Sequence, residues 1–114
     1  MNDDTIFGKI ARGEMEANIV YEDEYCIAFR DLYPAAPTHI LLIPRKPIPR
    51  LCDADDSDQA LLGHMLLMAN KVADQEGYGD KFRLVVNNGE AAGQSVFHLH
   101  MHIIAGRPLS WPPG

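Results

Sequence analysis

The chain has little cysteine and more acidic than basic residues. Its 114 residues include two cysteines, Cys26 and Cys52, too few for the disulfide framework of a small secreted domain. We expect both to be reduced thiols in a cytoplasmic protein, with Cys26 in the core. The formal net charge of −6 argues against nonspecific nucleic-acid binding, which requires basic patches that displace counterions.

Long apolar runs, targeting segments and repeats are also missing. No stretch approaches the roughly 20 apolar residues of a membrane-spanning helix. The acidic segment 1–4 does not resemble a signal or transit peptide. No repeat, low-complexity tract or internal linker divides the chain, and its length is close to the modal size of one domain. We therefore expect residues 1–114 to form a single domain with no membrane partner.

The order of the predicted elements indicates an α+β fold with an antiparallel sheet. Apolar residues at helical spacing predict a long helix from about Asp53 to Gly77, and Asp4-Thr5 can cap a short helix that ends at Gly13. An early hairpin, and one long helix between the third and fourth strands, favour helices on one face of the sheet and a free face for a ligand. The apolar runs predict strands at 19–21, 25–30, 39–43, 82–87 and 96–104.

Three histidines stand at every second position in the last predicted strand. Successive side chains of a strand point to opposite faces, so His98, His100 and His102 are predicted to share one face. Leu99 and Met101 would then face the core. The blandest interpretation is a set of polar residues on an exposed strand face.

A zinc site is a second interpretation of this row. Zinc is often held by His-x-His and a third ligand. His98 and His102 begin roughly 13 Å apart along a strand, which is too far for all three histidines to converge on one ion. Two neighbouring histidines together with His39 remain possible ligands. The sequence has no Cys-x-x-Cys, no His-Glu-x-x-His and no obvious carboxylate ligand beside the row.

Nucleophilic catalysis at phosphorus is the third interpretation. A neutral imidazole is a good nucleophile when an acceptor holds its other ring nitrogen. The loop 89–95 enters the histidine row directly, and its glycines allow backbone amides to turn toward an anion. Such donors would stabilise the charge that develops on the phosphoryl oxygens.

The segment 93–104, GQSVFHLHMHII, resembles the signature of the histidine triad (HIT) superfamily. Residues 4–10, 28–31 and 36–39 and the Trp-Pro-Pro-Gly tail resemble its Hint branch, the purine nucleoside phosphoramidases. The resemblance covers nearly the whole chain. It implies a HIT-like fold with a five-stranded antiparallel sheet, one long and one short helix, and a homodimer whose two sheets join into ten strands. It implies no metal and no other cofactor.

The resemblance also implies catalytic roles for five residues. His100 would attack phosphorus and form a nucleotidyl-histidine intermediate that water hydrolyses. The carbonyl of His98 would orient the His100 ring, and His102 would donate to a phosphate oxygen. His39 would support the cluster as a fourth histidine, and Ser95 would contact the phosphate or the leaving group.

The implied substrate is an adenosine or other purine nucleoside 5′-phosphoramidate, cleaved to AMP and an amine. Asp31 would bind the ribose hydroxyls, and Asn87 would contact the phosphate or leaving group together with backbone amides near Gln94 and Ser95. Leu32 and Met15-Glu16 differ from many relatives at the pocket rim and leave the purine preference open. The purine pocket would be lined by Phe7, Ile10, Phe29 and Leu32.

Other interpretations of these residues remain open. Phe7, Ile10 and Phe29 can be core residues, Asp31 a turn residue, and His39 a core histidine. For the whole protein, the alternatives are a nucleotide-binding regulatory protein with incidental hydrolysis and a zinc-binding interaction module. A chelator-induced loss of stability would favour the zinc-binding module.

Overall fold

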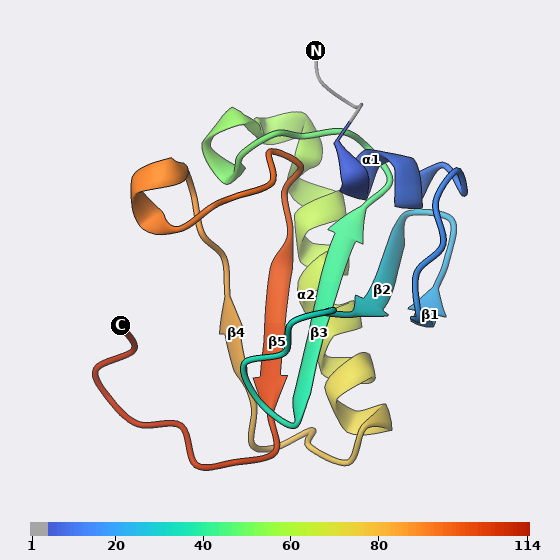
Figure 1. The fold of residues 1–114 in the computed structure, drawn as a ribbon. Helices are drawn as coiled ribbons and strands as arrows, with labels where there is room; N and C mark the ends of the chain where they lie inside the picture. Colours follow the sequence, from blue (N-terminus) through green and yellow to red (C-terminus); the bar gives the residue numbers. More distant parts are fainter. Residues whose placement is uncertain (1–4) are drawn as a thin grey trace.

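A computed structural model describes residues 5–114 and confirms an α+β fold built on a five-stranded antiparallel sheet (Figure 1). The strand order is β1-β2-β3-β5-β4, with β1 Ile19–Glu22, β2 Cys26–Arg30, β3 Thr38–Pro44, β4 Arg83–Val85 and β5 Met101–Ala105. The helices are α1 Ile6–Ala11 and α2 Gln59–Gln75, with 3₁₀ turns at Leu51–Asp53, Asp56–Asp58 and Glu90–Ala92. Within this part of the chain, no helix combines the length and hydropathy needed to cross a membrane.

The two helices cover opposite faces of the sheet, whereas the sequence predicted both on one face. α2 packs Met65 into a core with Leu42 and the fully buried Cys26, whose core position is thereby confirmed. α1 contributes Phe7 to a second core that contains Leu41. Leu41 and Leu42 belong to different cores because successive strand side chains point to opposite faces. α1 lies over only part of its face, near β2 and β3, and leaves the β5 side without a helix (Figure 1).

The short helix begins at the predicted cap. The Thr5 hydroxyl accepts a hydrogen bond from the amide of Gly8 at 3.0 Å, which satisfies one of the free amides of the first turn. The other predicted capping residue, Asp4, lies outside the described residues. The helix ends at Ala11, and Gly13 follows with a φ of 76°.

The long helix begins at Gln59, later than the predicted start near Asp53. The Asp55 carboxylate accepts from the Ser57 amide at 2.9 Å, and the Asp58 carboxylate accepts from the Asp55 amide at 3.0 Å. Side-chain acceptors of this kind compete with α-helical hydrogen bonds. The acidic segment therefore forms 3₁₀ turns that lead into α2.

The last strand is also shorter than predicted, because residues 96–100 leave the sheet. Pro44 ends β3 and has no amide hydrogen with which to extend the ladder. Its carbonyl oxygen instead accepts a hydrogen bond from Nε2 of His98 at 2.7 Å. His98 and His100 thus lie in an irregular segment, and the prediction of three histidines on one strand was wrong.

The alternation of side chains nevertheless continues through this irregular segment. The Leu99 amide donates to the carbonyl of Ile48 at 2.6 Å, which holds the segment against the proline-containing stretch after β3. Leu99 and Met101 both lie in the α2-side core, as predicted.

Candidate active site

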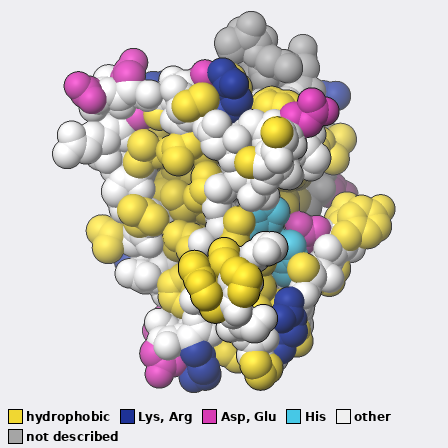
Figure 2. Space-filling model, turned by 90° about the vertical axis from the view of Figure 1, so that its left-hand side faces the viewer, with side chains coloured by type: hydrophobic (Ala, Val, Ile, Leu, Met, Phe, Trp, Pro, Cys, Tyr) yellow, Lys and Arg dark blue, Asp and Glu magenta, His cyan; other side chains and the backbone are white. Residues whose placement is uncertain are grey.

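Three histidines form a cluster on the sheet face that α2 does not cover. His39 on β3 and His102 on β5 have ring centroids 5.2 Å apart. The ring of His100, which precedes β5, lies 5.0 Å from that of His102. His98 is almost fully buried, and Nε2 of its ring donates a hydrogen bond to the Pro44 carbonyl. Figure 2 shows histidine side chains on the surface beside an acidic side chain, with hydrophobic side chains around them.

His100 has a defined tautomer. Its Nδ1 lies 2.8 Å from the carbonyl oxygen of His98. A carbonyl only accepts, so Nδ1 donates the hydrogen, and Nε2 of the neutral ring keeps a lone pair. Burial lowers the pKa of His100 below its ordinary value, although the His98 carbonyl and the Asp31 carboxylate act in the opposite direction. At neutral pH this buried ring is therefore uncharged, with a lone pair on Nε2.

The tautomer of His102 is fixed through a neighbour. The amide of Ala35 donates to Nδ1 of His39 at 2.9 Å, so the hydrogen of the neutral His39 ring is on Nε2. That Nε2 lies 2.9 Å from Nδ1 of His102, which must accept. The hydrogen of His102 is consequently on its Nε2.

The Nε2–H group of His102 has no protein partner. It is buried and meets no hydrogen-bond acceptor within residues 5–114. A buried donor left unpaired costs about 1–3 kcal/mol, which an acceptor on a ligand would recover. Burial, with repulsion from His100 and His39, lowers the pKa of His102 to about 4, so this ring is neutral at pH 7.

A carboxylate, that of Asp31, lies beside the cluster, although the sequence shows no obvious carboxylate ligand next to the histidine row. Oδ2 of Asp31 lies 3.4 Å from Nε2 of His39, while Oδ1 accepts from the Tyr33 amide at 2.8 Å. Ligand atoms of Asp31, His39 and His102 all lie within 4.8 Å of one another, so these three side chains are potential metal ligands. The sequence assigned Asp31 to the ribose hydroxyls and did not predict it as a potential metal ligand, because it lies far from the row along the chain.

The loop before the histidines has the backbone conformation that its glycines suggested. Gly89 has a φ of 92° and Gly93 a φ of 100°, a region that other residues rarely adopt. A Cβ on Gly93 would lie 3.6 Å from the side-chain nitrogen of Asn87. Asn87 is half-buried, and its amide therefore packs against this loop.

Gln94 holds the loop together from the inside. Its buried side chain accepts from the Gly89 amide at 2.8 Å and donates to the carbonyls of Pro49 and Val96. Its own amide donates to the Gly89 carbonyl at 3.0 Å. The side-chain amide and the main-chain amide of Gln94 therefore both donate to protein carbonyls. Ser95, which follows it, is exposed.

A cavity of about 400 Å³ adjoins the histidine cluster. One wall is the apolar core under α1, where Phe7 stands edge-on to Phe29, with ring centroids 5.6 Å apart. Phe7 also contacts His100, with ring centroids 4.9 Å apart, and so connects the cavity to the cluster. The cavity collects six of the predicted binding residues: Phe7, Ile10, Phe29, Asp31, Leu32 and Ser95.

Leu32 and Asn87 have different positions relative to this cavity. Leu32 is 82% exposed and contributes to the rim. Asn87, Gln94, His100 and His102 do not line the cavity itself. Phe7, Ile10 and Phe29 were also interpreted as possible core residues. Their side chains belong to the core and also form the cavity wall, so the two interpretations are compatible.

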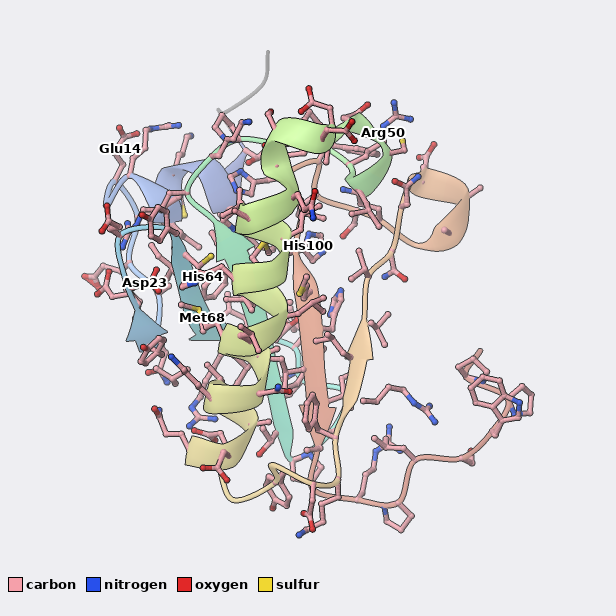
Figure 3. The ribbon with its side chains drawn as sticks, turned by 180° about the vertical axis from the view of Figure 1, so that it is seen from behind. Glu14, Asp23, Arg50, His64, Met68 and His100 are labelled. Atoms are coloured by element: carbon pink, nitrogen blue, oxygen red, sulfur yellow. The ribbon has the colours of Figure 1, made fainter. Side chains whose placement is uncertain are left out.

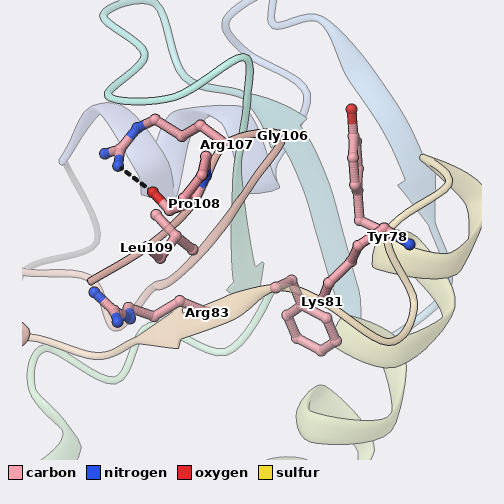
Figure 4. A pocket seen from close by; sticks show the side chains of 8 residues that line it. Tyr78, Lys81, Arg83, Gly106, Arg107, Pro108 and Leu109 are labelled. Atoms are coloured by element: carbon pink, nitrogen blue, oxygen red, sulfur yellow. Dashed lines mark hydrogen bonds between the residues drawn. The ribbon is translucent and has the colours of Figure 1, made fainter. Parts of the chain in front are cut away.

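A larger cavity of about 520 Å³ lies elsewhere, between β4 and the C-terminal segment (Figure 4). Its two arginines bind the main chain: Arg83 donates to the Ser110 carbonyl, and Arg107 donates to the carbonyls of Pro108 and Ala35. Its lysine, Lys81, donates to the Asp80 carboxylate. No histidine lines it. We therefore assign the chemistry to the smaller cavity beside His100.

Two main-chain groups that orient the histidines were not predicted from the sequence. They are the Ala35 amide on His39 and the Pro44 carbonyl on His98. Every residue has a carbonyl group and every residue except proline an amide, so residue type gives no signal for such contacts.

Comparisons with known proteins agree with this arrangement. A family model of the HIT domain matches residues 12–109. An uncharacterized HIT-like protein of Synechocystis is 61% identical over 114 residues, which is 100% of both chains. A HIT family hydrolase of Legionella pneumophila has a TM-score of 0.93 and 46% identity, with coverage of 96% of this chain and 98% of that one. A histidine triad protein of Clostridium difficile has a TM-score of 0.90 and 42% identity, with 96% of both chains covered.

The family model covers most of the chain, including the loop 89–95 and all four clustered or neighbouring histidines. The structural relatives share the whole sheet and helix arrangement at more than 40% identity. The chain belongs to the HIT domain family.

Proposed function

We propose that this protein hydrolyses the P–N bond of purine nucleoside 5′-phosphoramidates and releases AMP and an amine. The observation that carries the proposal is the hydrogen bond from Nδ1 of His100 to the His98 carbonyl at 2.8 Å. It leaves Nε2 of a buried, neutral ring with the lone pair that attack on phosphorus requires. The Legionella pneumophila relative is described as a hydrolase, which supports a hydrolytic reaction.

The proposed reaction has two displacement steps at phosphorus. Nε2 of His100 forms a bond to phosphorus while the P–N bond to the leaving group breaks, and the amine departs with that electron pair and takes up a proton from solvent. The phosphorylated ring is then cationic, and the His98 carbonyl stabilises its Nδ1–H group. Water attacks phosphorus, releases a proton to solvent, and returns His100 to its neutral form with AMP as product.

The phosphate would be held by donors that the protein itself does not use. The Nε2–H group of His102 is buried and has no acceptor among residues 5–114. The exposed Ser95 lines the cavity, and Asn87 packs against the same loop. The Gln94 side chain is occupied by Gly89, Pro49 and Val96, and its main-chain amide by the Gly89 carbonyl. We therefore assign Gln94 the support of the loop in place of the nucleotide contact first predicted.

The nucleoside would occupy the cavity of about 400 Å³. Phe7, Ile10 and Phe29 offer apolar walls to a purine, with Leu32 at the rim. Asp31 retains carboxylate lone pairs beyond those bound by Tyr33 and His39, and we assign it the ribose hydroxyls.

The same proposal includes a single domain over residues 1–114, a homodimer and a cytoplasmic location. The uninterrupted sheet and its two cores support one domain. Exposed Leu66 and Leu67 on α2 support a dimer in which the long helices pack together. Free Cys26 and Cys52 are compatible with a reducing compartment.

The experiment is a comparison of wild type with His100→Ala on an adenosine phosphoramidate. We expect amine release to fall by at least about 1,000-fold, as when an enzyme loses its nucleophile, while AMP still binds. Mass spectrometry of acid-quenched wild type should detect a nucleotidyl adduct that the variant lacks. Undiminished turnover by His100→Ala would overturn the proposal, and faster cleavage of a diadenosine polyphosphate would reassign the substrate.

A second candidate is zinc binding at Asp31, His39 and His102, favoured by the proximity of their ligand atoms. It predicts stoichiometric zinc in the purified protein and a loss of stability on chelation. Full phosphoramidase activity after exhaustive chelation would exclude a zinc requirement in the proposed reaction.

A further inference from the structure

A second group of potential metal ligands lies on the opposite side of the sheet from the histidine cluster. Asp23 is in the turn between β1 and β2, Cys26 begins β2, and His64 is on α2. Their ligand atoms all lie within 4.8 Å of one another. Figure 3 shows Asp23 and His64 side by side where the β1–β2 hairpin meets α2. We name these three residues the hairpin–helix cluster.

The Asp23 carboxylate has a fixed orientation. Its Oδ1 accepts from the amides of Tyr25 at 2.8 Å and Cys26 at 2.9 Å. Its Oδ2 is thereby directed at Nε2 of His64, at a distance of 2.6 Å. The Tyr25 ring stands edge-on to the His64 ring, with centroids 5.3 Å apart. Two of the three ligands are therefore oriented before any ion binds.

We propose that the hairpin–helix cluster binds a zinc ion through Oδ2 of Asp23, Sγ of Cys26 and Nε2 of His64. Thiolate, imidazole and carboxylate are the ligand types that zinc prefers in proteins, and water completes a tetrahedron. A cavity of about 280 Å³, lined in part by Asp23 and His64, gives the ion access. This proposal is independent of the phosphoramidase activity.

The distance between the oxygen and nitrogen ligands requires only a small adjustment. Tetrahedral zinc with bonds of about 2.0 Å to nitrogen and oxygen holds two such atoms about 3.3 Å apart. Oδ2 of Asp23 and Nε2 of His64 must therefore separate slightly, because the ion replaces the hydrogen bond between them. The His64 side chain is 37% exposed and has room to move.

Two nearby cations and the protonated Cys26 thiol oppose zinc binding. Arg45 donates to the Asp23 carbonyl at 2.9 Å, and Lys71 lines the neighbouring cavity, so two cations oppose the ion. Burial and the Asp23 carboxylate raise the pKa of the Cys26 thiol to about 12. Zinc must displace the thiol proton, and binding therefore releases a proton and weakens at low pH.

Bound zinc would connect elements that are separated along the chain. Asp23 and Cys26 belong to the hairpin, and His64 belongs to α2. A metal bridge between them would add stability to the packing of α2 without contacting the nucleotide cavity. The expected role is structural.

Cobalt(II) and zinc titrations of chelator-treated protein test the proposal. Cobalt bound at the hairpin–helix cluster should give a sulfur-to-cobalt charge-transfer band in the near ultraviolet, and zinc should abolish this band. Asp31, His39 and His102 contain no sulfur, so cobalt at that site gives no such band. Absence of the band in wild type would overturn the proposal.

Variants identify the ligands. Cys26→Ala should lose the band, whereas the matched variant Cys52→Ser, at the exposed cysteine, should keep it. Should Cys26→Ala fail to fold, His64→Gln tests the same site at a partly exposed position and should weaken the cobalt affinity at least about 10-fold. Zinc should raise the melting temperature of wild type and not that of His64→Gln. Equal affinity in wild type and His64→Gln would leave only an Asp23–His64 hydrogen bond and refute the site.

Discussion

Nε2 of His39 lies 2.9 Å from Nδ1 of His102, and the Ala35 amide on the other side of the His39 ring decides which of the two atoms carries the hydrogen. A main-chain amide thus sets the protonation of a ring that it does not touch. The consequence is an Nε2–H donor on His102, in the position where the proposed mechanism requires one.

Substitution of His39 should therefore impair the reaction through His102. In His39→Leu we expect kcat to fall about 10- to 100-fold, the range for loss of a group that orients a functional histidine, with a smaller change in KM. His39→Gln can still donate an amide hydrogen to Nδ1 of His102 and should recover part of kcat. Steady-state kinetics on both variants check this, and equal kcat values in the two would contradict the tautomer argument.

Acid should destabilise the fold in the range set by His102. Burial, with repulsion from His100 and His39, lowers its pKa from the ordinary 6.5 to about 4. Between these values the unfolded chain binds a proton that the folded ring does not, so the free energy of unfolding falls as pH falls from 6.5 to about 4. Urea unfolding across this range measures the slope, and His102→Asn should reduce it. A slope unchanged in that variant would assign the effect to other groups.

The pH dependence of activity should follow His100. Its pKa is lowered by burial, so the neutral nucleophile persists below pH 6.5. We expect the acid limb of the kcat/KM profile to lie below the ordinary histidine pKa, since this limb reports the free enzyme. An acid limb above pH 6.5 would contradict a buried, neutral His100.

Gln94 should be a major contributor to stability although it lies next to the segment that carries the proposed nucleophile. Its side chain is 2% exposed and makes hydrogen bonds to Gly89, Pro49 and Val96. Gln94→Leu leaves buried main-chain groups unpaired and should cost about 2–4 kcal/mol of unfolding free energy. The matched variant Gln75→Leu removes one exposed hydrogen bond to the Val20 carbonyl and should cost less than about 1 kcal/mol. Similar losses in the two variants would refute the role assigned to Gln94.

Two glycine-to-alanine substitutions should have opposite effects. Gly93 has a φ of 100°, so Gly93→Ala should cost about 1–3 kcal/mol and lower kcat by disturbing the loop beside Ser95. Gly63 lies within α2 with nothing within 4 Å of an added Cβ, so Gly63→Ala should stabilise by about 0.5–1 kcal/mol. Thermal unfolding compares them. A Gly63→Ala variant that is less stable and weakens self-association would instead place Gly63 in a dimer interface.

The sequence predicted which elements exist better than where they begin. All five strands and both helices were anticipated from apolar spacing. The start of α2 was misplaced because Asp55 and Asp58 cap 3₁₀ turns with their own side chains. The last strand was extended too far because the missing amide of Pro44, which limits the pairing, belongs to a strand distant in sequence.

The sequence by itself determined the alternation that separates His100 and His102 from Leu99 and Met101, because backbone geometry makes this pattern local. Only the tertiary structure decided which atoms carry hydrogens and which residues meet. It placed Asp31 beside His39, and it placed His64 beside Asp23 and Cys26. Such contacts depend on the packing of strands and α2, to which segments far apart in the chain contribute. No local pattern specifies them.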